Sequence, residues 1–277
     1  MVMNPDSFRF DGKRAVVVGG ATGMGAATAA LVQQLGADVV VMDHVDIAIP
    51  GVQAIKVDLR DEASIDAAVA ECGGPIDALF SCAGAADGTP GIEKINFIGH
   101  RHLIDRALAA DLMPRGSAIA MISSAAGLAW EKNLDLLKEY LDTPDFDSAS
   151  AWIAEHPGKA DYMWSKQAVC AYVARSAMSM QLRGIRINAI LPGPTDTPLA
   201  RSQADLWLGT GADYREAVGV KASTAEEQAG PLVFLCSDAA IYVNGITMIT
   251  DGGWVSSGLT GSFPEAGPII NFLYGRY

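Results

Sequence analysis

The stretch RAVVVGGATGMGAA, residues 14–27, decides the fold. Its apolar first half stops at a cluster of glycines and is followed by an alanine-rich segment. Gly19, Gly23 and Gly25 stand in a G-x-x-x-G-x-G pattern, which predicts a tight turn between a strand and a helix. Without a Cβ, these residues let the backbone approach a phosphate, and the helix N-terminus presents free N–H groups to it. A plain turn is the alternative for the glycines taken alone.

An acidic residue follows the glycines at the place where a dinucleotide-binding fold needs one. Asp43 ends the next apolar run, VVVMD at residues 39–43. A carboxylate there accepts hydrogen bonds from the adenosine ribose and repels a 2′-phosphate. No Lys or Arg stands within the glycine pattern or directly after Asp43. We therefore expect NAD(H) rather than NADP(H) as the cofactor; a surface Asp at a strand end is the alternative.

Short β-rich runs alternate with helical segments along the chain. Several runs are apolar at consecutive positions, as in strands that are covered on both faces. This alternation predicts a doubly wound parallel α/β sheet of the Rossmann type. We expect strands at 15–18, 39–42, 54–57, 78–80, 118–122, 186–190 and 246–249, and helices at 26–35, 64–72, 95–111, 162–182 and 225–235.

Composition narrows the class of protein. The chain has 277 residues, half of them hydrophobic, and no Gly/Ser/Pro linker, so we expect one domain over residues 1–277. A net charge of −12 argues against nucleic acid and anionic membranes as partners. No run approaches the roughly 20 apolar residues of a membrane span, and no secretory signal opens the chain. Four cysteines without a C-x-x-C pair, and histidines without ligand spacing, indicate no metal and a cytoplasmic location.

Two segments exceed what this scaffold needs. Residues 131–161 form an insertion between a strand and a helix; Leu134, Leu137 and Leu141 have helical spacing within it. Ser148 is the expected N-cap of a second short helix over 149–156. The other segment is a C-terminal extension, residues 254–277. Long connections of this kind are usually lids, binding loops or disordered, and the sequence leaves open whether the extension covers the site or a partner.

Tyr162 and Lys166, in the segment YMWSK, stand at positions i and i+4 and so share one helix face. Free tyrosine has a pKa of roughly 10 and is a poor base at neutral pH. A nearby ammonium group favours the phenolate and lowers that pKa. The pair is therefore a candidate for moving a proton to or from an alcohol oxygen.

The order of these and further landmarks resembles the short-chain dehydrogenase/reductase family over residues 12–253. The family's usual Asn-Asn-Ala-Gly is here Ser81-Cys82-Ala83-Gly84, which keeps the small pair beside the cofactor. The other landmarks are the Gly19–Gly25 turn, Asp58-Leu59, Asn96, Ser124, Tyr162 with Lys166, Pro192-Gly193 with Thr195 and Thr197, and Asp251-Gly252-Gly253.

The resemblance implies a role for each catalytic residue. Ser124 is expected to hold the substrate oxygen beside Tyr162, the general acid/base; its neighbour Ser123 is the competing choice. Lys166 is expected to bind the nicotinamide ribose and to lower the tyrosine pKa. Asn96 is expected to hold a helix kink and a water that relays protons to solvent.

The same resemblance implies the cofactor contacts. Asp58 and Leu59 bracket the adenine, and the loop at 192–197 fixes the nicotinamide carboxamide and closes over the pyrophosphate. The whole predicted set is Gly19, Thr22, Gly23, Met24, Gly25, Asp43, Asp58, Leu59, Ser81, Ala83, Gly84, Tyr162, Lys166, Pro192, Gly193, Thr195 and Thr197.

The long insertion before Tyr162 and the short connection from Gly84 to Asn96 are similar, more loosely, to the bacterial 3α-hydroxysteroid dehydrogenase/carbonyl reductase branch. This implies an enzyme that interconverts a secondary alcohol and a ketone, with a bulky apolar substrate such as a hydroxysteroid. A smaller keto or acyl substrate and a non-catalytic NAD-binding regulator are the alternatives. The family also implies a homo-oligomer, a dimer or tetramer.

The expected walls of the substrate pocket come from the insertion and from a substrate loop at 198–220. Their large apolar residues either line the pocket or pack against the body or a neighbouring subunit, and the sequence leaves both open. These residues are Trp130, Leu134, Leu137, Trp152, Leu206 and Trp207.

Overall fold

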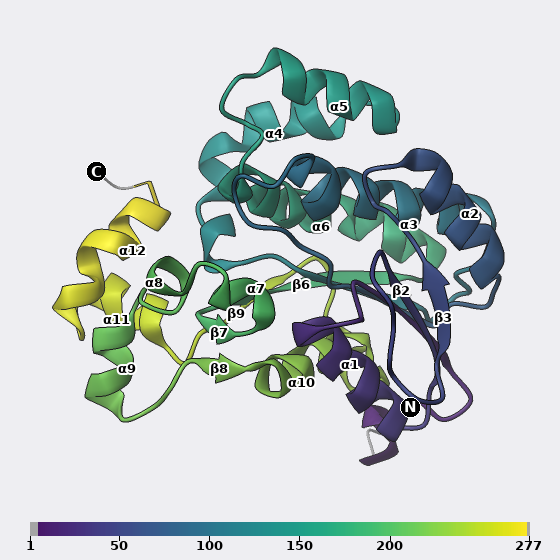
Figure 1. Ribbon diagram of the computed structural model, residues 1–277, viewed down its shortest axis with the longest axis horizontal. Helices are drawn as coiled ribbons and strands as arrows, with labels where there is room; N and C mark the ends of the chain where they lie inside the picture. Colours follow the sequence, from purple (N-terminus) through teal and green to yellow (C-terminus); the bar gives the residue numbers. More distant parts are fainter. Residues whose placement is uncertain (1–4, 276–277) are drawn as a thin grey trace.

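A seven-stranded parallel sheet forms the centre of the computed structural model, which describes residues 5–275 (Figure 1). The strand order is β3-β2-β1-β4-β5-β6-β9. The second and third strands of the chain therefore lie on one side of β1, and the later strands of the sheet lie on the other side. This confirms the predicted doubly wound Rossmann-type fold, with strand ends shifted by one or two residues at most. The strands are β1 (Arg14–Val18), β2 (Asp38–Asp43), β3 (Gln53–Lys56), β4 (Ala78–Ser81), β5 (Ala118–Ile122), β6 (Arg186–Pro192) and β9 (Thr247–Thr250).

Helices cover both faces of the sheet, and the alternation of side chains along β1 shows why. Val16 and Val18 point to the face of the sheet that α2, α3 and α6 cover. Ala15 and Val17 point to the opposite face, which α1 and α10 cover. Successive residues of a strand point to opposite faces, so a strand between two helical layers is apolar throughout. The helices are α1 (Gly23–Gln34), α2 (Glu62–Cys72), α3 (Gly99–Ala109), α6 (Tyr162–Arg183) and α10 (Ala225–Cys236).

The expected helix at 95–111 is divided in two. A π-helical turn covers Lys94–Ile98, and α3 continues from Gly99. Asn96 lies in this turn and is fully engaged: its Oδ1 accepts from the Ala85 N–H at 2.7 Å, and its Nδ2 donates to Ser165 Oγ at 3.1 Å. π-helical turns inside α-helices frequently occur at functional sites.

The insertion forms two helices, α4 (Leu134–Leu141) and α5 (Phe146–Glu155), after a short 3-10 turn (Trp130–Asn133). The predicted cap of the second helix was wrong: Asp145 is the N-cap, and its carboxylate accepts the Ser148 N–H at 2.8 Å. An acceptor side chain on extended backbone ahead of the helix outcompetes a serine already inside the first turn. The helix therefore starts before residue 149.

The C-terminal half adds small elements at one end of the sheet, on the left of Figure 1. There, Tyr214, Trp254 and Ile270 pack in a separate apolar cluster that joins the substrate loop to the C-terminal extension. The extension is thus folded onto the body. The elements are β7 (Thr195–Asp196) paired with β8 (Ser223–Thr224), α7 (Pro198–Arg201), α8 (Ala204–Trp207), α9 (Ala212–Val218), α11 (Trp254–Thr260) and α12 (Gly267–Leu273).

None of the helices within residues 5–275 combines the length and the apolar character that crossing a bilayer requires. In the same part of the chain, no three His, Cys, Asp or Glu side chains gather as a metal ion would require.

Candidate active site

A cavity of about 630 Å³ opens at the carboxyl ends of the parallel strands. A second hollow of about 250 Å³ adjoins it, and Gly19, Asp43, Ala83 and Gly84 line both. The shared lining lies where the strand order reverses between β1 and β4. Crevices at such switch points are the usual ligand sites of open α/β sheets.

The glycine turn forms one wall, and each glycine is there for a different reason. A Cβ on Gly25 would lie 2.0 Å from the Gly19 carbonyl oxygen, so this position packs helix against strand. Gly19 has a φ of +79°, and a Cβ on it would lie 2.3 Å from the backbone nitrogen of Ala83. Gly23, at +56°, faces the Thr197 side chain 3.5 Å from its Cβ position. The close approaches at Gly19 and Gly25 are therefore to backbone atoms, whereas Gly23 lies beside a side chain.

The N-terminus of α1 points into this turn without a competing anion. Thr22 is the N-cap residue and makes no side-chain capping hydrogen bond, and the first turn holds no acidic residue. The first N–H groups of a helix favour an anionic ligand. At Gly84, a Cβ would lie 3.7 Å from Lys166 Nζ, so its absence leaves room beside that amine. Both features fit a dinucleotide with its pyrophosphate at α1 and a ribose near Lys166.

Asp43 is buried and fixed at the end of β2. Its Oδ2 accepts the Ala21 N–H at 3.0 Å, and its Oδ1 accepts the Val45 N–H at 3.2 Å and lies 3.1 Å from His44 Nδ1. The carboxylate is thus held between the glycine turn and the second hollow. A ribose hydroxyl placed there would meet an acceptor that cannot turn away.

The second hollow contains a cation that the sequence reasoning passed over. Arg60 directly follows the predicted pair Asp58 and Leu59, which was the available signal, and all three line this hollow. The guanidinium of Arg60 binds Asp58 at 2.7 Å and 2.9 Å, and it lowers the pKa of that carboxyl to about 2. The charge of Arg60 is therefore already paired.

Tyr162, Ser124 and Lys166 meet in the large cavity. The Ser124 hydroxyl is close enough to the Tyr162 phenol to lower its pKa through hydrogen bonding. Lys166 Nζ lies 5.4 Å from the centre of the tyrosine ring and donates to the Ile122 carbonyl at 3.0 Å. Asp161 caps α6 by accepting the Trp164 N–H at 2.6 Å, which fixes the helix that carries both residues. A phenol, a hydroxyl and an ammonium group thus surround one space.

The protein environment shifts the pKa values of this group. The pocket walls desolvate the phenolate and raise the pKa of Tyr162 to about 12; the Ser124 hydrogen bond lowers it, and the charge of Asp87 adds to the rise. Burial lowers the pKa of Lys166 to about 8. The direction for Tyr162 differs from the lowering of the pKa that the sequence predicts, because desolvation outweighs the Ser124 hydrogen bond. The lowering stays a prediction for the enzyme with cofactor and substrate bound.

Two predicted residues lie behind the cavity rather than in its wall. Asn96 is in the π-helical turn described above, and Ser81 is buried with its hydroxyl unpaired among the described residues. Ser123, the competitor of Ser124, donates to the Lys166 carbonyl at 2.8 Å, so its hydroxyl is used to hold α6. Every other predicted cofactor residue lines one of the two hollows: Gly19, Thr22, Gly23, Met24, Gly25, Asp43, Asp58, Leu59, Ala83, Gly84, Tyr162, Lys166, Pro192, Gly193, Thr195 and Thr197.

The apolar end of the cavity is built from the substrate loop and from α12. Trp207 lies with its ring centre 4.9 Å from that of Tyr162, and Leu206 is beside it in the lining. The tail contributes Ile269, Phe272 and Leu273, which the sequence reasoning missed. Their helical spacing in GPIINFLYG was a signal, but it did not show which surface they cover.

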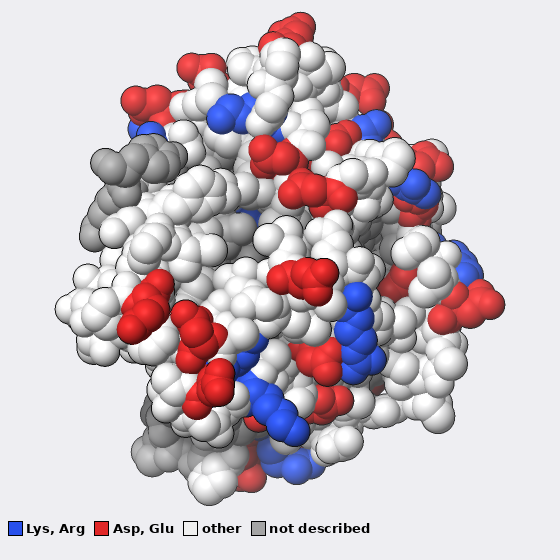
Figure 2. Space-filling model, turned by 60° about the vertical axis from the view of Figure 1, so that its left-hand side comes forward, with Lys and Arg blue, Asp and Glu red and all other residues white. Residues whose placement is uncertain are grey.

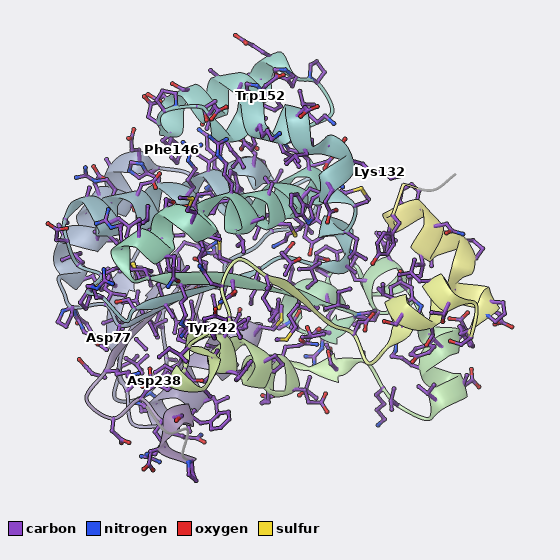
Figure 3. The ribbon with its side chains drawn as sticks, turned by 180° about the vertical axis from the view of Figure 1, so that it is seen from behind. Asp77, Lys132, Phe146, Trp152, Asp238 and Tyr242 are labelled. Carbon is purple, nitrogen blue, oxygen red and sulfur yellow. The ribbon has the colours of Figure 1, made fainter. Side chains whose placement is uncertain are left out.

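The insertion packs against the body instead. Trp152 stacks on Trp164 with ring centres 5.8 Å apart, and Leu137 is fully buried in the core. Figure 3 shows Trp152 and Phe146 among the insertion helices, away from the C-terminal helices, whereas Lys132 lies next to the tail and donates to the Gly275 carbonyl. The cavity lining therefore includes Leu206 and Trp207 among the predicted wall residues, while Trp130, Leu134, Leu137 and Trp152 lie outside it.

The cavity and the fold together define a dinucleotide-binding oxidoreductase, and comparison with known proteins agrees. The short chain dehydrogenase family matches residues 13–134, and the enoyl-(acyl carrier protein) reductase family matches residues 146–255. The chain belongs to the short-chain dehydrogenase/reductase family, which binds a nicotinamide cofactor, and its relatives include dehydrogenases that act on CH–OH groups.

Individual relatives cover nearly the whole chain. A 3-alpha-hydroxysteroid dehydrogenase/carbonyl reductase of Comamonas testosteroni is 31% identical over 86% of this chain and 95% of its own. A coniferyl-alcohol dehydrogenase of Pseudomonas sp. (strain HR199 / DSM 7063) is 29% identical over 88% and 97%. The fold matches the crystal structure of a 3-alpha-hydroxysteroid dehydrogenase from Pseudomonas sp. B-0831 complexed with NADH, with a TM-score of 0.72 at 24% identity over 91% and 99% of the two chains.

Proposed function

We propose that this protein is an NAD(H)-dependent oxidoreductase that interconverts a secondary alcohol and a ketone. One observation carries the proposal: the Tyr162 phenol, the Ser124 hydroxyl and the Lys166 amine line the same cavity as the glycine turn. A nicotinamide dinucleotide, when bound, supplies the acceptor or donor of the hydride. The chain's own residues then supply orientation and the proton.

In the oxidation direction, Tyr162 as phenolate accepts the hydroxyl proton of the substrate while the carbon gives up its hydride. In reduction, the neutral phenol returns that proton to the carbonyl oxygen. Ser124 donates to the same oxygen and stabilises the negative charge that develops on it. Lys166, held by the Ile122 carbonyl, faces the phenolate with a positive charge and stabilises it. Asn96 and Ser165 form a hydrogen-bonded chain behind Tyr162 and hold the turn beside it.

Asp43 supports the choice of NAD(H). Its fixed, buried carboxylate matches a ribose that carries two free hydroxyls and repels a 2′-phosphate. Asp43→Asn keeps an acceptor for the Ala21 N–H and removes the charge. We expect this variant to lower the preference for NADH over NADPH by roughly tenfold, the effect of losing one close charge repulsion. Wild-type protein that binds NADPH far more tightly than NADH would contradict the role given to Asp43.

The cavity walls support a bulky, largely apolar substrate such as a hydroxysteroid. Leu206, Trp207, Ile269 and Phe272 surround the end beyond Tyr162, and each offers apolar surface to a multi-ring or terpenoid alcohol. By their names, the two dehydrogenases above act on a 3-alpha-hydroxysteroid and on coniferyl alcohol. A small keto or acyl substrate would leave most of this surface in contact with water.

A substrate screen with both cofactors tests the proposal. Hydroxysteroids, aryl and terpenoid alcohols and small hydroxy acids are each offered with NAD⁺ and NADP⁺, and the matching ketones with NADH and NADPH. NADH absorbance reports turnover in either direction. We expect turnover with NAD(H) and a preference for the ring systems. Tight NADH binding without turnover of any compound would favour a regulator over an enzyme.

We further propose a cytoplasmic homo-oligomer. The four cysteines are all free thiols, as is usual in a reducing compartment. Met178 and Leu182 on α6 are largely exposed, and Asn244 in the turn after Tyr242 hydrogen-bonds the Ala177 carbonyl beside them. Exposed apolar groups gathered on one face are typical of protein contacts. Light scattering with Met178→Asp and Leu182→Asp variants tests whether this face joins copies of the chain.

A further inference from the structure

Asp87 lies in the short connection between β4 and the π-helical turn, at the wall of the large cavity. Its Oδ1 accepts a hydrogen bond from the backbone N–H of Tyr162 at 2.7 Å. Its own carbonyl lies 3.5 Å from Gln203 Nε2 in the substrate loop. Asp87 is an exposed residue of this wall. Asp87 thus stands between the general acid/base and the loop that shapes the substrate end.

The N-terminus of α6 would otherwise attract an anion at this place. Free N–H groups and the helix dipole favour negative ligands at a helix start. Here Asp87 accepts from the first N–H, that of Tyr162, and Asp161 accepts from that of Trp164. The chain itself therefore supplies the negative charge that this helix end attracts.

The remaining charges of the cavity lie elsewhere. Asp43 and His44 mark the ribose end beside the glycine turn, and Lys166 is buried with its amine on the Ile122 carbonyl. The lining of the same cavity includes the apolar Trp207, which lies against the Tyr162 ring, and Leu206 beside it in the substrate loop. Low-dielectric walls strengthen the repulsion between like charges. The side of the molecule with α9, α11 and α12 also carries scattered acidic side chains (Figure 2).

We propose that Asp87 is a specificity-determining residue that selects against substrates bearing a carboxylate or phosphate near the reacting carbon and admits neutral ones. This inference rests on the proposed function. The charge of Asp87 also raises the pKa of Tyr162, so it acts across the distance to the reacting oxygen. A substrate anion near that oxygen experiences the same charge.

A matched pair of ring alcohols tests this role: cis-2-hydroxycyclohexanecarboxylate, whose carboxylate is on the carbon next to the reacting one, and its neutral methyl ester. kcat/KM is measured for both with NAD⁺ in the wild type and in three variants. Asp87→Asn keeps the acceptor for the Tyr162 N–H and removes the charge. Asp87→Glu keeps the charge. Asp161→Asn is the matched control, because it removes a carboxylate from the same helix end outside the cavity lining.

We expect Asp87→Asn to raise the carboxylate-to-ester ratio of kcat/KM by roughly tenfold, mainly through KM for the carboxylate, as the loss of one close repulsion predicts. Asp87→Glu and Asp161→Asn should leave the ratio as in the wild type. Rising salt should narrow the difference between the two compounds in the wild type and leave it unchanged in Asp87→Asn.

Each result decides something. Ester turnover with an unaltered ratio in Asp87→Asn would overturn the inference and leave the proposed function standing. An equal rise in Asp161→Asn would also overturn it, since the effect would then come from the helix end as a whole. Failure of the wild type to oxidise the ester with either cofactor would count against the proposed function for ring alcohols, and the inference would fall with it.

Discussion

The two halves of the cavity are built in different ways. At the cofactor half, Gly19 and Asp43 follow or end adjacent strands, and the pairing of Val18 with Met42 fixes the distance between them. At the substrate half, Trp207 and Phe272 come from α8 and α12, which lie far apart in the sequence and meet only in the folded chain. The cofactor half is formed by the ends of neighbouring strands, and the substrate half is formed by helices outside the sheet.

This difference teaches where the protein can vary. A change in the glycine turn disturbs the backbone contacts that join α1 to the sheet, so the fold and the cofactor site change together. A change on α8 or α12 alters the shape of the substrate end without touching a strand. Substrate specificity can therefore change through α8 and α12 while the sheet and the cofactor site stay the same.

The largest effect is expected where the two halves meet. Tyr162→Phe removes the proton donor and acceptor but keeps the ring against Trp207. Turnover should fall by roughly 10²- to 10⁴-fold, the usual contribution of general acid–base catalysis. NADH fluorescence should still report tight cofactor binding, because the glycine turn, Asp43 and Lys166 are unchanged. Substantial turnover in a clean preparation would show that another group moves the proton.

A pair of helical glycines tests whether the cofactor half depends on close backbone contact. Gly25→Ala places a methyl group 2.0 Å from the Gly19 carbonyl oxygen, so α1 must move; we expect a loss of about 3 kcal/mol in the free energy of unfolding and weaker NADH binding. Gly230→Ala in α10 is the control, since a Cβ there meets no heavy atom within 4 Å apart from the two residues next to it in the chain. Pro231 follows and disfavours a helical residue that carries a Cβ, which offsets the gain in helix propensity, so the free energy of unfolding should change by less than about 1 kcal/mol. Thermal unfolding measures both; equal effects would refute the close-contact argument.

The same division explains what the sequence predicts well. The strands of the sheet and the cofactor residues of the glycine turn are specified by local patterns, and the structure has each of these strands with only its ends shifted. Register between parallel strands then carries Asp43 to its place beside Ala21 without any further information. Local pattern and sheet pairing give the same answer, so the strands of the sheet are predicted correctly.

The residues that line the substrate half cannot be predicted from the sequence in this way, and the reason is physical. An apolar residue on a surface helix, such as Trp152 or Trp207, has the same pattern whether it covers the core or a cavity. Trp152 stacks on Trp164 in the core layer, whereas Trp207 lies against Tyr162 in the cavity. The wrong cap at Ser148 is a smaller case, because a competing acceptor stood at Asp145. Tertiary contacts between distant segments decide these outcomes.

Those two tryptophans provide the next prediction. Trp207→Ala should raise KM for a bulky alcohol by roughly tenfold through lost apolar contact, with NADH affinity unchanged. Trp152→Ala is the matched control: it should cost about 2–3 kcal/mol in the free energy of unfolding and leave KM unchanged. Steady-state kinetics and chemical denaturation separate the two effects. A KM effect in Trp152→Ala would place the insertion in the substrate half after all.

The smallest expected effect concerns Lys166. Its buried amine lies between the cofactor half and the substrate half of the cavity. Burial lowers its pKa to about 8 from an ordinary value of 10.5, so between these values the unfolded chain holds the proton more tightly than the folded one. The free energy of unfolding therefore rises with pH through this window, since the cost of burying the charge disappears. Lys166→Met lacks this gain, so its stability relative to the wild type should fall by on the order of 1 kcal/mol between pH 7.5 and pH 9.5. Lys221→Met, at an exposed position, is the control for the loss of a lysine charge as such. If the free energy of unfolding of Lys166→Met changed with pH in the same way as that of the wild type, the amine would keep its charge in the folded protein. It would then face the phenol and the ribose as a buried ammonium group.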